Sequence, residues 1–181
     1  MVSGARRPTV QAALPALPIK PEHLAVVRAA MVGVNVEGTS APAFKGAAYT
    51  SAAKTGTAQV VAIKQDEKYN AAKTSERLRD HALFIAFAPA EAPTIALALV
   101  VENAGFGAAS AAPIARRVFD YWLQGLYPQA EDIAAVQQGQ AGPPIKPPIP
   151  VAEWAARSAA AASTASTALT VAAAPQPKVT R

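Results

Sequence analysis

A short polar cluster, Lys54-Thr55-Gly56-Thr57, leads directly into an apolar stretch that contains β-branched residues. These residue types suit the capture of a carboxylate. Lysine carries a positive charge, and two threonine hydroxyls at a spacing of two residues lie on one face of a strand. The glycine between them has no side chain to block a close approach. The pattern predicts an anion-binding strand whose binding residues are Lys54, Thr55, Gly56 and Thr57.

A possible nucleophile lies just before this cluster. Ser51-Ala52-Ala53-Lys54 matches a Ser-x-x-Lys pattern, in which a lysine takes the proton of an attacking serine. That chemistry requires a helix, because residues i and i+3 then share a face. In a strand the same two residues point to opposite faces. Because this match overlaps the predicted strand, we predict that Ser51 is not a nucleophile.

The other residues that could do chemistry are expected to be structural. His23 lies in the first turn of a predicted helix and His81 precedes an apolar strand, and neither has a second ligand or a serine at a familiar spacing. Asp80 and Glu102 lie at the ends of adjacent elements, where carboxylates normally meet solvent. The absence of cysteine excludes disulfides, thiolate metal sites and a cysteine nucleophile. We expect no metal and no other cofactor.

Composition excludes further classes of partner. The chain has 181 residues, with 17 Lys and Arg against 12 Asp and Glu. This excess is spread thinly, without a run of four basic residues, so we predict no nucleic-acid partner. The longest strongly apolar run, residues 94–101, is shorter than the roughly 20 residues of a membrane-spanning helix. Prolines interrupt the first 20 residues, so no signal peptide is predicted.

The elements that must position the polar cluster follow from local patterns. Pro21 to Gly33 has apolar residues at spacings of three and four, which predicts an amphipathic helix. The strand with the polar cluster is predicted over about residues 50–63. Residues 64–80 are densely charged and predict a loop, with a helical turn near 75–79. Two apolar runs, 81–88 and 94–101, predict a β-hairpin with a five-residue loop.

The apolar runs and the helix after them indicate the fold class. Both runs are apolar at nearly every position, so we expect both faces of the sheet to be covered. One cover is a helix with Ser110 as its N-cap, ended by Pro128, whose apolar stripe consists of Ile114, Val118, Trp122 and Leu126, reinforced by Phe119 and Leu123. The helix from Pro21 to Gly33 is a partial cover for the other face, but two helices are too few for this sheet, so we expect part of it to be left exposed. The predicted class is α/β (α+β), a predominantly antiparallel sheet flanked by helices.

Composition also divides the chain. Residues 1–20 predict an irregular lead-in, because prolines leave no room for a periodic element. Residues 21–127 are the predicted folded part. Residues 128–181 are rich in Pro, Ala and Gln, which predicts a mostly disordered tail. Within this tail, Val151 to Ala162 is predicted to be transiently helical, because alanine has the best helix propensity.

Several stretches carry a resemblance to a known family. They are Met31-Val32-Gly33-Val34 leading to Gly38-Thr39-Ser40, Ala53 to Val60, Tyr69-Asn70-Ala71, Glu76 to His81, Ala86-Phe87-Ala88-Pro89, and Val101 to Gly105. In these stretches, which span about residues 20–127, the chain resembles the class B penicillin-binding proteins, in particular their elongation-type peptidoglycan D,D-transpeptidases. The resemblance implies part of the penicillin-binding transpeptidase fold, which is similar to that of the serine β-lactamases.

The resemblance also implies roles for the polar cluster. Family enzymes are serine acyltransferases that cross-link cell-wall stem peptides through an acyl-serine intermediate, and β-lactams mimic their substrate. By resemblance, Thr55 and Thr57 bind the carboxylate of a D-Ala-D-Ala stem peptide or of a β-lactam, and Lys54 sets the positive field. The main-chain N–H of Thr57 provides half of an oxyanion hole, where fixed donors stabilise the tetrahedral intermediate.

The chain departs from the family pattern in one respect. The family uses three motifs, Ser-x-x-Lys, Ser-x-Asn and Lys-Thr/Ser-Gly, and Lys54-Thr55-Gly56 is the third. The first two belong well upstream, and no Ser-x-Asn occurs in the 181 residues. We therefore expect the C-terminal part of a transpeptidase domain, with the substrate-binding strand but without a catalytic residue of its own, and inactive alone. The missing N-terminal part of the domain is an expected partner.

Two further expectations concern location and an alternative function. Family members are anchored in the inner membrane and work on its periplasmic face, whereas this sequence shows no signal peptide or transmembrane segment. The alternative is a non-catalytic interaction module, in which the hairpin and the following helix form a docking surface and the disordered tail tethers it. An upstream reading frame that encodes Ser-x-x-Lys and Ser-x-Asn would favour the transpeptidase.

Overall fold

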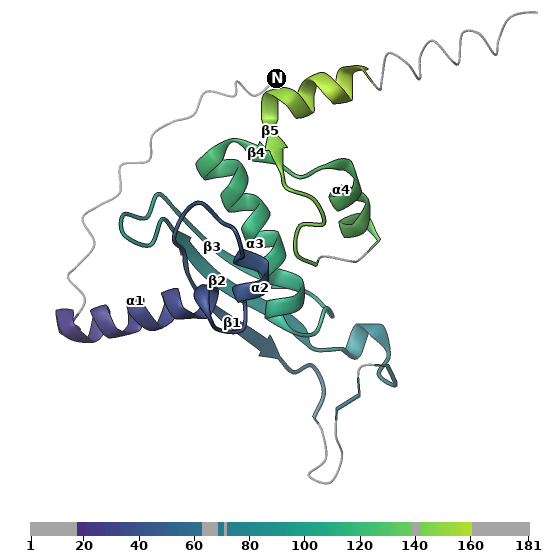
Figure 1. Ribbon diagram of the computed structural model, residues 1–181. Coiled ribbons are helices and arrows are strands. Elements are labelled where there is room, and N and C mark those ends of the chain that lie inside the picture. The colour runs from purple at the N-terminus through teal and green to yellow at the C-terminus, as the bar shows by residue number, and fades with distance from the viewer. Residues whose placement is uncertain (1–17, 63–68, 71, 139–141, 161–181) are drawn as a thin grey trace, which may run out of the picture.

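A computed structural model describes residues 18–62, 69–70, 72–138 and 142–160 of the chain (Figure 1). Its elements are, in order, α1 (Pro21–Val36), α2 (Ala41–Phe44), β1 (Ala52–Ala58), the 3-10 helix η1 (Glu76–Leu78), β2 (His81–Ala88), β3 (Ile95–Val101), α3 (Gly107–Gln124), β4 (Leu126–Tyr127), α4 (Ala130–Gln137) and β5 (Ile149–Pro150). Residues 151–160 form a further helical segment. Most of the predicted lead-in, residues 1–17, lies outside the described residues.

The central layer is a three-stranded antiparallel sheet with the order β1-β2-β3. In its register Gly56 lies opposite Leu83, and Phe84 lies opposite both Thr55 and Leu99. The predicted hairpin and the predicted fold class are therefore confirmed. The strand that carries the polar cluster is shorter than predicted, because β1 ends at Ala58.

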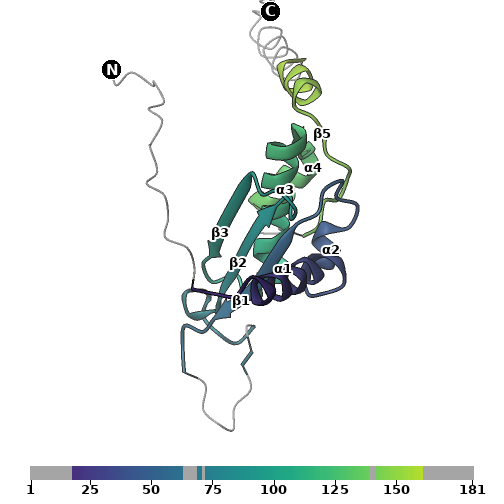
Figure 2. The same ribbon diagram turned by 90° about the vertical axis from the view of Figure 1, so that its left-hand side faces the viewer.

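One face of the sheet packs against α2 and α3, which lie on the same side of it in Figure 2. From β1 and β2 this face receives mostly small residues and Phe84, whose ring stacks on Phe44 at a centroid distance of 6.1 Å, and β3 adds Ile95, Leu97, Leu99 and Val101. Phe119 of α3 completes the aromatic centre, 6.3 Å from Phe44. The alanines around these three rings allow α3 to lie close to the sheet, so the core is built from a few rings and many methyl groups.

The closest approach of α3 to the sheet occurs at the polar cluster. A Cβ added to Gly107, the first residue of α3, would lie 2.1 Å from the main-chain oxygen of Leu83 and 2.7 Å from that of Gly56. No side chain fits there, so glycine is required for the start of α3 to contact β1 and β2. This contact places the N-terminal end of α3 beside Lys54-Thr55-Gly56-Thr57.

The predicted shortage of cover is confirmed for the described residues, which leave one face of the sheet largely open. On the face opposite α3, Ile85 is 51% exposed and Val100 is 63% exposed. Helix α1 contacts this side only near one end of the hairpin, where Arg28 lies over the ring of Phe87 at 5.9 Å. Apolar residues of α1 itself are exposed, Val26 at 69% among them. The alternating burial of β2 shows a sheet with one covered face.

Helix α3 differs from the prediction at both ends and on its buried face. It begins at Gly107 after an N-cap at Phe106, whereas the hydroxyl of Ser110 donates to the main-chain oxygen of Ala104 at 2.7 Å. It ends at Gly125, which has φ = 63°, and not at Pro128. The main predicted stripe is wrong, although Phe119 of the reinforcing pair is buried as expected: the buried residues are Gly107, Ala111, Ala112, Pro113, Ala115, Arg116, Phe119 and Asp120. Small residues on this side let α3 lie close to the sheet, and Arg116 and Asp120 neutralise each other.

The predicted disorder of residues 128–181 is wrong for the part that the structure describes. Strand β4 pairs with β5, and Asp132 of α4, 1% exposed, accepts a hydrogen bond from the N–H of Ile145 and pairs with Arg117. Trp154 packs on Tyr127 with ring centroids 4.3 Å apart. These few anchors hold a segment of low-complexity composition. Residues 161–181 lie outside the described residues, and the division of the chain into domains stays a prediction.

The buried face of α3 can be tested with two aromatic truncations. Phe119→Ala removes a ring that is 0% exposed and should lower the free energy of unfolding by about 3–5 kcal/mol. Trp122→Ala removes a larger side chain that is 60% exposed and should cost less than about 1 kcal/mol. Urea denaturation followed by circular dichroism measures both. Equal losses would contradict this orientation of α3.

Candidate functional site

The polar cluster lines a groove at the edge of the sheet. The groove has a volume of about 500 Å³ and is lined by Thr39, Lys54, Thr55, Gly56, Thr57, Phe106, Gly107 and Ala108. Its walls come from the turn after α1, from β1 and from the start of α3. The structure therefore brings the four predicted binding residues together and adds residues from two other elements. The larger cavity of about 750 Å³ between α1 and Phe87 is apolar and carries no comparable polar cluster.

The groove contains two sources of positive potential. Lys54 is exposed, and its Nζ donates to the main-chain oxygen of Thr55 at 2.6 Å. The start of α3 forms another wall, and the first main-chain N–H groups of a helix have no partner within the helix. The helix dipole adds partial positive charge at that end. An anion in the groove would thus meet a lysine, threonine hydroxyls and free main-chain donors.

Because β1 is an edge strand, half of its main-chain N–H and C=O groups point away from β2. Gly56 lies in the middle of this edge. A Cβ at Gly56 would lie 3.1 Å from Cβ of Leu83, so a side chain there would press on the neighbouring strand. The edge can therefore offer main-chain donors and acceptors to an extended ligand without an intervening side chain at Gly56.

Thr39 is a groove residue that sequence reasoning missed. Its Oγ1 lies 3.2 Å from Oγ1 of Thr55, close enough for a hydrogen bond in which either hydroxyl is the donor. The sequence placed Gly38-Thr39-Ser40 in a turn that leads to the strand, with no link to the anion-binding residues. The signal available was that the stretch is polar and lies at a turn, which does not reveal a contact across 16 residues.

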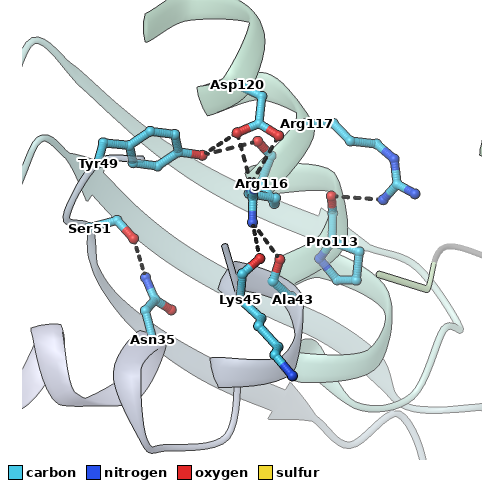
Figure 3. Close-up of polar contacts among 9 residues, drawn as sticks. All are labelled: Asn35, Ala43, Lys45, Tyr49, Ser51, Pro113, Arg116, Arg117 and Asp120. Carbon is cyan, nitrogen blue, oxygen red and sulfur yellow. Dashed lines mark hydrogen bonds and ion pairs between the residues drawn. The ribbon is translucent and has the colours of Figure 1, made fainter. Parts of the chain in front are cut away.

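A buried chain of hydrogen bonds supports this turn. The Oγ of Ser40 donates to Oδ1 of Asn35 at 2.6 Å. Figure 3 shows the next bond of the chain, in which Nδ2 of Asn35 donates to Oγ of Ser51 at 2.7 Å. All three side chains are buried. Ser51 lies immediately before β1 and is 4% exposed, with its oxygen engaged as an acceptor. These contacts give Ser51 a structural position in the fold.

A second buried network fixes the segment between α2 and β1. Nε of Arg116 donates to both carboxylate oxygens of Asp120, at 2.8 and 2.9 Å, and its Nη1 donates to the main-chain oxygen of Lys45 at 3.0 Å (Figure 3). The hydroxyl of Tyr49 donates to the same carboxylate at 2.8 Å. Burial first, and then the charge of Asp120, raise the pKa of Tyr49 well above its ordinary value. The network ties the chain that enters β1 to α3.

The remaining chemical candidates lie outside the groove. Nδ1 of His81 accepts a hydrogen bond from the N–H of Asn103 at 2.9 Å, which holds the turn after β3. Asn103 has φ = 57°, and its side chain donates to the main-chain oxygen of Arg79. Glu102 is exposed as expected, but Asp80 is only 6% exposed, so the expectation that it meets solvent is wrong. Its main chain is held between Tyr69 and Gly105, which draws the side chain inward.

The described residues contain neither a metal-binding cluster nor a helix that could span a membrane. In this part of the chain, no group of three or more His, Asp or Glu side chains is arranged so that it could hold a metal ion. Within the same residues, no helix has the length and apolar character needed to cross a membrane.

Comparison with known proteins identifies the family. The model of the penicillin-binding protein transpeptidase domain matches residues 6–120. The chain therefore belongs to the penicillin-binding protein transpeptidase family. The similar proteins are of the penicillin-binding protein 2 type. The chain is 48% identical over 94 residues to the peptidoglycan D,D-transpeptidase MrdA of Haemophilus influenzae, and the aligned residues make up 52% of this chain and 14% of that protein. It is 41% identical over 127 residues to MrdA of Salmonella typhimurium, 69% of this chain and 20% of that protein.

A solved structure agrees with the family assignment. The crystal structure of Pseudomonas aeruginosa PBP2 in complex with WCK 5153 aligns with a TM-score of 0.51 and 33% identity, over 67% of this chain and 24% of that chain. The alignment confirms a partial penicillin-binding transpeptidase fold. The chain spans between a seventh and a quarter of the length of these similar proteins.

The Tyr49 hydrogen bond gives a prediction with a defined pH dependence. At pH 7, Tyr49→Phe should lower the free energy of unfolding by about 1 kcal/mol, because a buried hydrogen bond to a carboxylate is lost. Above pH 10, tyrosine ionises at its ordinary pKa of 10.0 in the unfolded chain but not in the folded one. The wild-type chain then loses up to about 1.4 kcal/mol per pH unit from this group, and the variant does not.

The difference between the two chains should therefore stay constant from pH 7 to 9, shrink above pH 10 and reverse in sign about one pH unit higher. Urea titrations at a series of pH values measure it, and the other three tyrosines are common to both chains. A difference that does not change up to pH 12 would show that burial of Tyr49 does not raise its pKa.

Proposed function

We propose that this chain supplies the substrate-binding strand of a peptidoglycan D,D-transpeptidase. In this proposal Lys54, Thr55 and Thr57 hold the carboxylate of a D-Ala-D-Ala stem peptide or of a β-lactam, and Gly56 leaves the strand edge open. The observation that supports it best is the convergence of these four residues with the start of α3 in one groove.

The groove suits a carboxylate on electrostatic grounds. Hydrogen bonds from a lysine or from main-chain N–H groups to a carboxylate are shorter and stronger than those between neutral partners. Lys54 contributes charge, and the hydroxyls of Thr55 and Thr57 contribute donors. The N-terminal end of α3 contributes further positive potential without a second charged side chain. Each contribution favours an anion over a neutral group of the same shape.

The edge strand also suits acyl transfer. Attack on the ligand carbonyl by a serine produces a tetrahedral oxyanion, which fixed N–H donors stabilise. The main-chain N–H of Thr57 is the donor that we assign to this role, by resemblance to the family. An extended peptide bound along β1 would bring its carbonyl to this donor by adding to the strand edge.

The attacking serine is not assigned within this chain. The Ser-x-x-Lys match at Ser51 is buried and bonded to Asn35, and the sequence has no Ser-x-Asn. We propose that acylation requires residues from the rest of a transpeptidase domain, which is then the partner of this chain. In the family this chemistry takes place on the periplasmic face of the inner membrane, and we propose the same place for the complete enzyme.

A non-catalytic interaction module is the second candidate. The observation in its favour is the open apolar face of the sheet, with Ile85 and Val100 exposed beside the exposed apolar residues of α1. A module would present this face to an unrelated partner. DNA upstream that encodes Ser-x-x-Lys and Ser-x-Asn in frame would decide for the transpeptidase, and a promoter and stop codon before Met1 would decide for the module.

Carboxylate binding can be measured on the chain itself. N-acetyl-L-Lys-D-Ala-D-Ala, titrated into the ¹⁵N-labelled chain, should shift the amide resonances of Thr55, Gly56 and Thr57. The same peptide with a C-terminal amide should bind at least tenfold more weakly, because it offers no charged acceptor. Lys54→Gln should weaken binding of the acid about tenfold, and Lys73→Gln, exposed and outside the groove, should not. Equal binding of acid and amide would sink the proposal.

Covalent chemistry needs a separate measurement. A fluorescent penicillin should not label the purified chain, because no serine of the described residues lines the groove with a lysine to activate it. A complete relative such as Haemophilus influenzae MrdA serves as the positive control. A labelled band that survives denaturation, and that is lost in Ser51→Ala, would show that Ser51 is a nucleophile after all.

A further inference from the structure

We propose that Thr39 is a positioning residue of the carboxylate site: its hydroxyl donates to Oγ1 of Thr55, so that the Thr55 proton is directed at the bound carboxylate. This proposal rests on the proposed function of the groove and adds a residue from outside the Lys-Thr-Gly-Thr segment. The two oxygens are 3.2 Å apart, and both side chains line the same groove.

The direction of the hydrogen bond follows from counting protons. A threonine hydroxyl has one proton to donate, and it can also accept. A carboxylate can only accept, so Thr55 must use its single proton on the ligand. Thr39 must then be the donor in the pair. The donated bond also polarises the Thr55 hydroxyl, which strengthens the bond that Thr55 makes to the ligand.

The turn that carries Thr39 is held on both sides. Before it, Gly38 approaches α1 so closely that an added Cβ would lie 2.7 Å from Cα of Val34, and its N–H donates to the oxygen of Gly33. After it, Ser40 is fully buried and joined through Asn35 to Ser51. Because Ser51 immediately precedes β1, this chain of hydrogen bonds sets the position of Thr39 relative to Thr55.

Threonine has a further advantage over serine at this position. A β-branched side chain has restricted χ1 freedom, so the hydroxyl of Thr39 is held toward β1 with little loss of entropy. The role predicts a rank order for ligand binding: Thr39 first, Thr39→Ser slightly weaker, and Thr39→Val weakest. Valine keeps the shape of threonine and removes only the hydroxyl.

The first measurement needs no ligand. The χ1 angle of Thr55, obtained from three-bond scalar couplings in the free chain, should correspond to one rotamer in the wild type and in Thr39→Ser. In Thr39→Val its population should shift among the few χ1 rotamers open to a β-branched residue, because the hydroxyl that selects one of them is gone. Thr94→Val, which removes an exposed hydroxyl in the loop before β3, is the matched control and should have no effect. An unchanged Thr55 rotamer in Thr39→Val would overturn the positioning role.

The second measurement is binding of N-acetyl-L-Lys-D-Ala-D-Ala, followed at the amides of residues 55–57. Thr39→Val should weaken binding roughly five-fold, and Thr39→Ser less than two-fold. If the wild type binds the acid and Thr39→Val binds it equally well, the inference is overturned and the proposed function stands. If the wild type does not distinguish acid from amide, the proposed function fails, and the rotamer measurement still decides whether Thr39 orients Thr55.

A folding defect in Thr39→Val would be distinguished from the loss of the hydroxyl by the amide resonances of other elements. Thr39 is exposed, so Thr39→Val should leave the amide resonances of α3 and β3 unchanged. If they shift, Thr39→Ala replaces it, because alanine also removes the hydroxyl and adds no apolar bulk to the turn. Retention of both the Thr55 rotamer and the wild-type affinity in Thr39→Ala would contradict the proposal.

Discussion

The groove depends first on the buried ion pair between Arg116 and Asp120. Taking two charges out of water is costly, and the cost is offset here because the donors and acceptors are used: Arg116 reaches Asp120 and the main chain at Lys45, and Asp120 also accepts from Tyr49. Removing one partner would leave an unpaired buried charge, at about 3–5 kcal/mol. The pair does more than join two residues of one helix. It holds the segment that enters β1 against α3, and so sets where the anion-binding strand begins.

The wall of the groove that α3 forms depends on how closely the helix approaches the main chain of the sheet. Gly107 lets α3 begin against β1, because a Cβ there would overlap the main chain of Leu83 and Gly56. The second hydrogen-bond chain, Asn35 with Ser40 and Ser51, then fixes the turn that brings Thr39 to Thr55. Helix start, strand and turn each contribute one wall. The three contacts that fix these walls are the Arg116–Asp120 network, the Asn35 hydrogen bonds and the close approach at Gly107. A change in any of them would move donors that must converge on one small anion.

Sequence reasoning succeeded where the signal is local. The polar cluster in a strand, the hairpin and the helix from Pro21 follow from spacing and turn residues within a few positions. Sequence reasoning failed where burial or position depends on residues that are distant in the chain. Of the large apolar residues that the sequence assigned to the buried face of α3, Phe119 is fully buried and Trp122 is exposed. Small residues fill most of that face, and Arg116 and Asp120 are buried because they satisfy each other. Thr39 could not be found, since its neighbour lies 16 residues away in the chain. The segment after Tyr127 has a disordered composition, yet Asp132 and Trp154 anchor it.

The open face of the sheet is the reverse case. There the sequence indicates a covered face, and the described residues provide no complete cover for it. Strand β2 is apolar on both faces, although only Ala82, Phe84, Ala86 and Ala88 are buried. A strand that faces water on one side needs polar residues there, and Ile85 and Phe87 do not meet that need. The chain spans 14% of the length of the Haemophilus influenzae relative, so most of such a protein lies outside the aligned segment. The apolar face and the groove border the same strand, β1, so any residues that cover this face would also lie beside the groove, where we propose that the attacking serine must come.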